Sequence, residues 1–178
     1  MFFFETYLSK VIKYDFINTF FYQDVKKIVK LKKIILNFGY QKSNFKDLVS
    51  GLLALEFISF QKGQITKSKN LNVFLKIKKG NPVGCKIVLT KSLMHFFYLK
   101  LLTSILSKTK HSQIFRCKWN LNLIKSISFR IKNPLLFIEL ENQFQFFKNI
   151  PQLDITLLTD SQSQKELVFL LKSIKFFL

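Results

Sequence analysis

The spacing of hydrophobic and polar residues divides the chain into helices and strands. Apolar side chains recur at helical spacing in four segments, at residues 5–22, 44–60, 91–106 and 160–174. Shorter apolar or alternating segments predict strands at residues 32–39, 65–78, 85–90, 123–131 and 152–159. This order segregates strands from helices, which favours an α+β fold with a mostly antiparallel sheet and helices packed on one face.

Two of the predicted strands form a hairpin. The second half of residues 65–78 alternates, and its apolar positions are Val73, Leu75 and Ile77. The connection to residues 85–90 contains Gly80, Pro82 and Gly84. Glycine and proline at this spacing favour a tight turn, so we expect a protruding hairpin loop with lysines on its exposed side.

Length and composition favour one domain over residues 1–178. The chain has 178 residues, 48% of them hydrophobic, which suffices for a sizeable core. Stretches without a charged side chain reach only about eight residues, whereas a transmembrane helix needs about 20 apolar residues, so no membrane span is expected. The first residues also lack the pattern of a signal or transit peptide.

Charge is the strongest overall signal. The chain carries 29 basic and 10 acidic residues, a formal net charge of +19. Sixteen of the basic residues and no acidic residue lie between Phe57 and Ile138. Such an uncompensated region indicates a polyanionic partner, either a nucleic acid or an anionic membrane surface. Because the lysines alternate along predicted strands instead of lining one long helix, we favour nucleic acid and keep the membrane surface as the alternative.

Residues that commonly carry catalysis are scarce and scattered. His95 and His111 are isolated, and Cys85 and Cys117 lack a nearby cysteine partner. The cysteines are best interpreted as small reduced apolar residues, with a disulfide as the alternative. No phosphate-loop or dinucleotide-binding fingerprint occurs, so the sequence predicts a protein that is not an enzyme, with no cofactor and no metal site.

The middle of the chain resembles a known family. The segments "KKIILNFG" and "FQKGQITKSKNLNVFLKIKKGNPVGCKIVLTKSLMHFF" are similar to the large-subunit ribosomal protein L-five family. The matching positions are Asn37, Gly39, Gln61, Thr66, Lys67, Gly80, Pro82, Gly84, Cys85 and Leu89. The resemblance is most specific over residues 32–106, and the tail at 152–174 resembles the family's closing strand and helix.

The resemblance implies a structural role in the central protuberance of the large ribosomal subunit. Members bind 5S rRNA, touch large-subunit rRNA, bridge to a small-subunit head protein and approach P-site tRNA. By position, the resemblance assigns rRNA binding, to 5S rRNA if present and to large-subunit rRNA, to Asn37, Gln61, Lys62, Thr66, Lys67 and Lys69. It assigns a tRNA-facing loop to Lys76, Lys78, Lys79, Gly80, Asn81, Pro82, Gly84 and Lys86.

Departures from the family pattern also carry information. Gly63 stands where the family usually has proline, and a long Gly- and Arg-rich segment is shortened at residues 107–122. The abundance of Phe, Lys, Ile and Asn is typical of an A/T-rich genome. We therefore expect an organelle-encoded protein of a mitochondrial ribosome in the matrix, with a plastid or the bacterial cytoplasm as the alternative.

Overall fold

A five-stranded antiparallel sheet forms the centre of the protein. The computed structural model describes residues 2–22, 24–41, 44–106 and 125–174. The strands are β1 (Leu31–Gly39), β2 (Gln64–Lys67), β3 (Pro82–Leu89), β4 (Ser126–Ile131) and β5 (Leu153–Thr159). Their spatial order is β2-β3-β1-β5-β4, and every neighbouring pair is antiparallel.

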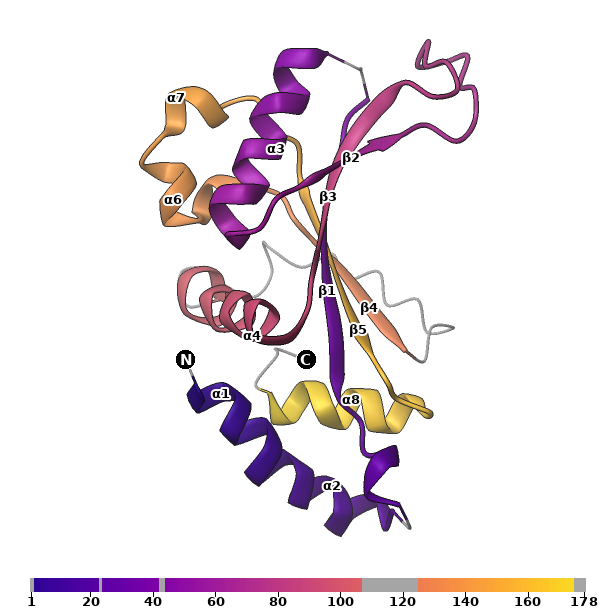
Figure 1. The fold of residues 1–178 in the computed structure, drawn as a ribbon, viewed down its shortest axis with the longest axis vertical. Coiled ribbons are helices and arrows are strands. Elements are labelled where there is room, and N and C mark those ends of the chain that lie inside the picture. The colour runs from indigo at the N-terminus through magenta and orange to yellow at the C-terminus, as the bar shows by residue number, and fades with distance from the viewer. Residues whose placement is uncertain (1, 23, 42–43, 107–124, 175–178) are drawn as a thin grey trace.

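The helices gather on one side and at one end of this sheet. In chain order the α-helices are α1 (Phe2–Tyr7), α2 (Lys13–Phe20), α3 (Phe45–Ser59), α4 (Lys91–Lys100), α6 (Ile138–Glu141), α7 (Phe144–Phe147) and α8 (Gln164–Ser173). Two π-helical segments, η1 (Leu8–Ile12) and η3 (Leu101–Leu106), continue α1 and α4, and two 3-10 turns are η2 (Val25–Lys27) and η4 (Pro134–Leu136). Figure 1 shows α3, α4, α6 and α7 on the same side of the sheet, with α1, α2 and α8 at its lower end. The predicted α+β fold is confirmed.

Alternation along the strands creates the core. The side chains that face the helices are buried; on the four longer strands they include Ile34, Leu36, Phe38, Cys85, Ile87, Leu89, Ile127, Phe129, Ile131, Leu153, Ile155 and Leu157. From the helices, Leu55, Ile58 and Tyr98 pack into this layer with no more than a trace of exposure. Since successive strand residues point to opposite faces, the intervening residues are directed to the other side of the sheet.

Aromatic contacts join the two ends of the chain. Phe169 of α8 meets Phe16 and Phe20 of α2 edge to face, with ring centroids 4.9 and 5.5 Å apart. Helix α8 begins with a capping box, in which Ser163 and Glu166 satisfy each other's backbone N–H groups. The lower end of the sheet is therefore closed by helices from both termini.

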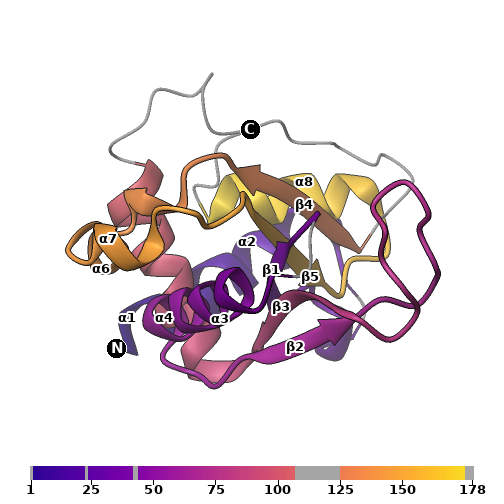
Figure 2. The ribbon, with the colours of Figure 1, turned by 90° about the horizontal axis from the view of Figure 1, so that it is seen from above.

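The predicted hairpin exists, but its strands were predicted wrongly. The first strand ends at Lys67 instead of residue 78, and residues 68–81 form a loop that extends from the sheet (Figure 2), which we call the finger. Val73 and Leu75, expected in the core, are 74% and 43% exposed, whereas Ile77 is buried. Val73 and Leu75 lie beyond the end of the sheet, where no helix packs against them.

The position of the turn was also predicted wrongly. Pro82 and Gly84 belong to β3, and the chain reverses instead between Asn72 and Ile77, which pair with each other as an isolated bridge. Proline is tolerated as the first residue of a strand, so its presence did not require a turn. The helical segments between residues 134 and 147 were not predicted, and the segment at 107–122, expected to be shortened, lies outside the described residues.

Candidate nucleic-acid interface

A row of polar side chains crosses the sheet face that points away from the helices. The strand register pairs Gln64 with Lys86, Lys86 with Asn37, Asn37 with Asp154, and Asp154 with Arg130. Paired residues of neighbouring strands point to the same side of a sheet. These five side chains therefore span all five strands on one surface, which we call the open face.

A shallow hollow lies on the open face around this row. It has a volume of about 720 Å³, and its lining includes Ile35, Asn37, Lys86, Ser128, Arg130, Lys132, Gln152, Asp154 and Thr156. Most of these side chains are polar, and the Ser128 and Thr156 hydroxyls lie 3.0 Å apart. The three cations in the lining outnumber its single carboxylate, so the hollow combines positive charge with neutral donors and acceptors.

Arg130 and Asp154 form a two-pronged ion pair within the hollow. The Nε and Nη2 groups of Arg130 donate to the two carboxylate oxygens of Asp154, at 2.5 and 3.1 Å. These hydrogen bonds and the carboxylate charge raise the pKa of the guanidinium, which is positive throughout the physiological range. The pair fixes the direction of a side chain that is 56% exposed.

Close packing holds the strands together where the finger begins. A Cβ atom on Gly84 would stand 2.6 Å from the Phe38 carbonyl oxygen and 2.8 Å from Thr66 Oγ1. Gly84 therefore allows Thr66 of β2 to lie against β3. The glycine has a packing role in the sheet and does not shape the turn.

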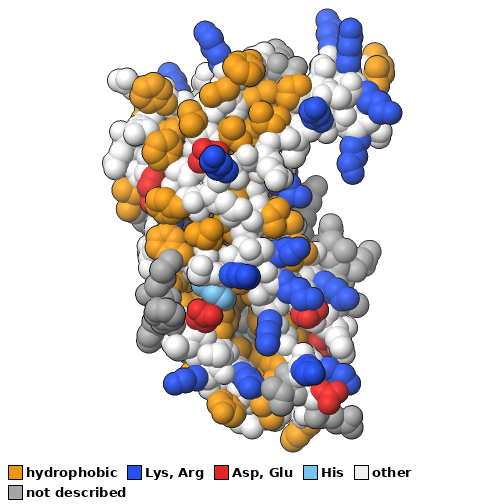
Figure 3. Space-filling view, viewed as in Figure 1, with side chains coloured by type: hydrophobic (Ala, Val, Ile, Leu, Met, Phe, Trp, Pro, Cys, Tyr) orange, Lys and Arg blue, Asp and Glu red, His pale blue; other side chains and the backbone are white. Residues whose placement is uncertain are grey.

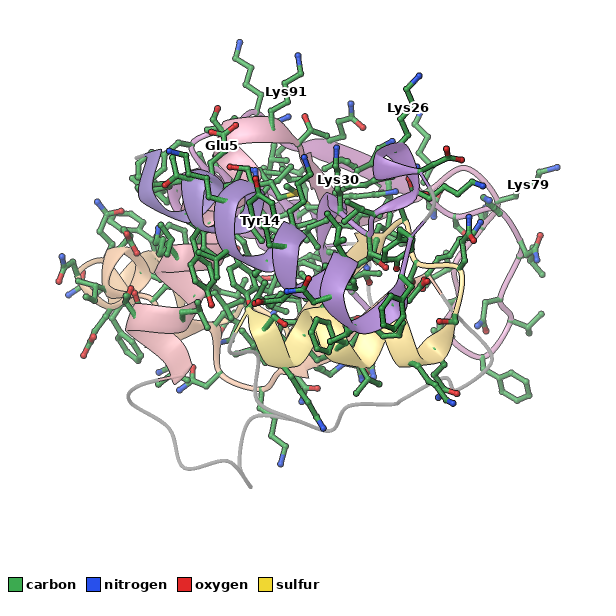
Figure 4. The ribbon with its side chains drawn as sticks, turned by 90° about the horizontal axis from the view of Figure 1, so that it is seen from below. Glu5, Tyr14, Lys26, Lys30, Lys79 and Lys91 are labelled. Atoms are coloured by element: carbon green, nitrogen blue, oxygen red, sulfur yellow. The ribbon has the colours of Figure 1, made fainter. Side chains whose placement is uncertain are left out.

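The finger presents lysines on a hydrogen-bonded frame. Ser68 N–H donates to the Asn81 carbonyl at 2.8 Å, and Gly80 N–H donates to the Ser68 carbonyl at 3.0 Å. The exposed lysines on or next to this frame are Lys67, Lys69, Lys76, Lys78 and Lys79. Figure 3 shows several lysine side chains around the finger, and Figure 4 shows Lys79 directed away from the body of the protein.

The six residues predicted to bind rRNA do not form one cluster. Asn37 lies at the centre of the open face, and Thr66 lies beside Gly84 at its edge. Gln61 and Lys62 lie in the connection between α3 and β2, next to the end of the helix. Lys67 and Lys69 lie at the base of the finger.

The eight residues predicted to face tRNA divide into two groups. Those on the finger are Lys76, Lys78, Lys79, Gly80 and Asn81. Pro82, Gly84 and Lys86 belong to β3 instead, and Lys86 lies in the hollow opposite Asn37. The prediction that Lys86 flanks the hairpin tip was wrong, because it assumed a tip at residues 80–84.

Sequence reasoning missed several residues of these surfaces. Gln64, Ser128, Arg130 and Asp154 were not predicted as site residues, although alternation alone would have turned each away from the core. Their meeting in one row depends on strand order, which a single sequence does not provide. Phe74 was not predicted as a site residue either and is 99% exposed on the finger.

Metal-ligand clusters and membrane-spanning helices are both absent from the described part of the chain. Within it, no three His, Cys, Asp or Glu residues are grouped closely enough to hold a metal ion. In the same residues, no helix is long and apolar enough to cross a membrane. Cys85 is buried, and its thiol donates to the Leu48 carbonyl at 3.3 Å, while Cys117 and His111 lie outside the described residues.

The fold and these surfaces define a basic α+β protein whose open sheet face and finger suit a polyanion. The chain is similar to large ribosomal subunit protein uL5 of Wigglesworthia glossinidia brevipalpis, at 34% identity over 161 residues that cover 89% of both chains. It is 30% identical to uL5m of Reclinomonas americana over 96% of this chain and 94% of that protein. It is 29% identical to uL5c of Rhodomonas salina over 96% of this chain and 93% of that protein. No family model matches the chain.

These relatives identify the family. The chain belongs to the uL5 family of large ribosomal subunit proteins, as its motifs at residues 32–106 predicted. Membership also makes it a structural protein and not an enzyme. Its relatives include bacterial, mitochondrial and plastid proteins, so the family alone does not distinguish between these compartments.

Proposed function

We propose that the protein is a structural constituent of the large ribosomal subunit that binds rRNA with its open face and approaches P-site tRNA with its finger. In this proposal it belongs to the central protuberance, contacts 5S rRNA where that RNA is present, and touches large-subunit rRNA and neighbouring proteins, including one of the small-subunit head. Residues 1–178 act as a single domain.

The polar row across the sheet is the observation that carries the proposal. A-form RNA exposes phosphates, 2′-hydroxyls and base edges along a wide, shallow minor groove. A shallow hollow with Lys86 and Arg130 for phosphates, and Asn37 for hydroxyls or base edges, matches that chemistry. The antiparallel sheet holds these groups in fixed register before RNA is bound.

The remaining sites lie around the β2 edge of this surface and on the finger. Thr66, Lys67 and Lys69 extend the rRNA contact from the open face toward the finger. Gln61 and Lys62 make a separate contact beside the end of α3. Lys76, Lys78 and Lys79 hold tRNA phosphates, and Gly80 and Asn81 shape the finger that carries them.

We assign the protein to a mitochondrial ribosome. The relative in Reclinomonas americana is a uL5m protein that matches nearly the whole chain, and the Phe- and Lys-rich composition is typical of organellar genes. A plastid or bacterial ribosome is the alternative. Whether isolated mitochondria or isolated plastids from the source organism synthesise the protein distinguishes these cases.

Salt-dependent binding tests the rRNA surface. The purified chain is titrated with a bacterial 5S rRNA transcript between about 50 and 300 mM salt. We expect Lys86→Gln to reduce the slope of log K against log salt by about 1, because one phosphate contact is lost. Asn37→Ala should weaken binding roughly 2- to 10-fold with the slope unchanged, because an uncharged hydrogen bond is lost.

Lys165→Gln is the matched control, since Lys165 is an exposed lysine of α8. It should leave both affinity and slope nearly unchanged. Equal effects of Lys86→Gln and Lys165→Gln would contradict the assignment of the open face. A flat salt response to RNA combined with tight binding to anionic vesicles would instead favour the membrane-surface alternative.

A further inference from the structure

The tip of the finger is ordered by its own hydrogen bonds. Asn72 and Ile77 exchange two backbone hydrogen bonds, of 2.9 and 3.0 Å, that close the turn. Inside it, Leu75 N–H donates to Asn72 Oδ1 at 3.2 Å, and Lys76 adopts a left-handed conformation with φ of 53°. Ile77 is buried beneath the tip. The turn therefore holds its shape without a ligand.

Phe74 stands at this tip almost free of contacts. It is 99% exposed, the highest value among the large hydrophobic residues that the structure describes, and its neighbour Val73 is 74% exposed. Lys76 and Lys78 follow in the same loop and are also exposed. A flat apolar ring on a loop that also carries exposed positive charges fits a ligand that combines an apolar face with nearby negative charge.

An RNA base meets this requirement. Every base has an aromatic face, and its own phosphates lie within reach of flanking lysines. An anionic membrane also offers apolar and negative groups, but surface-binding proteins use an amphipathic helix with several large anchors. The finger contains no helix and only one aromatic ring, although the aliphatic residues Leu71, Val73 and Leu75 are also exposed on it. The uL5 family belongs to an RNA-rich particle.

We propose that Phe74 stacks on a nucleobase that an RNA exposes, either unpaired or at the end of a base stack, while the finger lysines hold the adjacent phosphates. This inference rests on the proposed function, in which that RNA is the P-site tRNA. Stacking adds affinity that depends on the presence of a flat π-face and not on charge. The finger thus contains two separable parts, a lysine part and an aromatic part.

Four variants of the full chain test this separation against a fluorescein-labelled tRNA transcript at fixed salt. Phe74→Ala and Phe74→Leu should each weaken binding by about 5- to 100-fold, because both remove the aromatic face. Phe74→Tyr should stay within about 2-fold of the wild type. Phe146→Leu is the control, since Phe146 is 75% exposed on α7 and lies outside the finger.

The salt dependence of tRNA affinity distinguishes stacking by Phe74 from phosphate contacts by the lysines. The Phe74 variants should keep the wild-type slope of log K against log salt, whereas Lys76→Gln combined with Lys78→Gln should reduce it by about 2. If the lysine variant loses affinity but Phe74→Leu binds tRNA as well as the wild type, the stacking proposal is overturned and the proposed function stands. If the wild type does not bind tRNA, the stacking proposal and the tRNA part of the proposed function are both overturned, while rRNA binding by the open face is judged by the Lys86→Gln titration.

Binding to vesicles of phosphatidylcholine with 30% phosphatidylserine distinguishes insertion of Phe74 into a membrane from stacking on a nucleobase. Vesicle binding that Phe74→Leu preserves and Phe74→Ala abolishes would overturn the stacking proposal in favour of membrane insertion. Because Phe74 has almost no contacts within the protein, none of its variants should change the thermal midpoint by more than about 2 °C.

Discussion

Gly84 should be intolerant of even one added methyl group, whereas its cross-strand partner should accept it. Gly84 of β3 pairs with Gly39 of β1. The Cβ of an alanine at 84 would stand 2.6 Å from the Phe38 carbonyl oxygen and 2.8 Å from Thr66 Oγ1, but at Gly39 nothing lies within 4 Å. The two substitutions are chemically identical and occupy paired positions of the same sheet.

The magnitude follows from two opposing effects. Overpacking costs about 1–3 kcal/mol, and a backbone carbonyl cannot rotate away as the end of a flexible side chain can. Replacing glycine in a strand interior with alanine otherwise gains about 0.5–1 kcal/mol. We therefore expect Gly84→Ala to lower the free energy of unfolding by about 1–2 kcal/mol and Gly39→Ala to leave it unchanged or slightly raised.

Urea unfolding followed by circular dichroism measures both values under the same conditions. Adding Thr66→Ala to Gly84→Ala should recover only part of the loss, because the Phe38 carbonyl remains. Equal stability of the two single variants, or full recovery in the double variant, would refute the proposed clash.

Three further predictions concern the rest of the fold. Lys100→Met should lower the free energy of unfolding by about 2–3 kcal/mol. Lys100 Nζ lies 2.7 Å from Glu139 and donates to the Ile58 carbonyl at 3.0 Å, and its side chain is only 9% exposed. A loss below about 0.5 kcal/mol, as expected for Lys172→Met at an exposed lysine, would contradict this role. Burial raises the pKa of the Cys85 thiol to about 11. In a Cys117→Ser variant, Cys85 should therefore react with Ellman's reagent at pH 8 roughly 100-fold more slowly in the native protein than in the unfolded protein, and rapid native labelling would show that Cys85 is accessible. The stability of this variant should fall as the pH rises from about 8.5 to 11, because the unfolded thiol ionises first. If residues 1–178 form one domain, circular dichroism and tyrosine fluorescence should report the same unfolding midpoint, and two separate transitions would refute it.

The sequence predicted the elements that carry a regular hydrophobic pattern. All four predicted helical regions and the strands at β1 and β5 were found close to their expected bounds, because each buries one face against the core. The finger was mistaken for a strand since Val73, Leu75 and Ile77 alternate as strand residues do. Alternation reports a preference for burial on one side, but it cannot say whether a sheet is present to provide that burial.

The candidate site was predicted only in part for a related reason. Family motifs located Asn37 and Thr66, which the strand register places on or beside the open face. Arg130 and Asp154 are 24 residues apart in sequence and meet only because β4 pairs with β5. Single-sequence patterns do not encode that pairing, and they gave no reason to place Lys86 in the hollow instead of on the finger.

The most direct test of rRNA binding by the open face is lysine acetylation of the protein within isolated large ribosomal subunits. Mass spectrometry compares the rate at each lysine with the rate in the free protein. If the open face binds rRNA, Lys86 should be acetylated at least about tenfold more slowly in the subunit than in the free protein. Lysines on other surfaces provide the internal comparison. Labelling of Lys86 at the same rate in both states would contradict the central claim that this face of the sheet is covered by RNA.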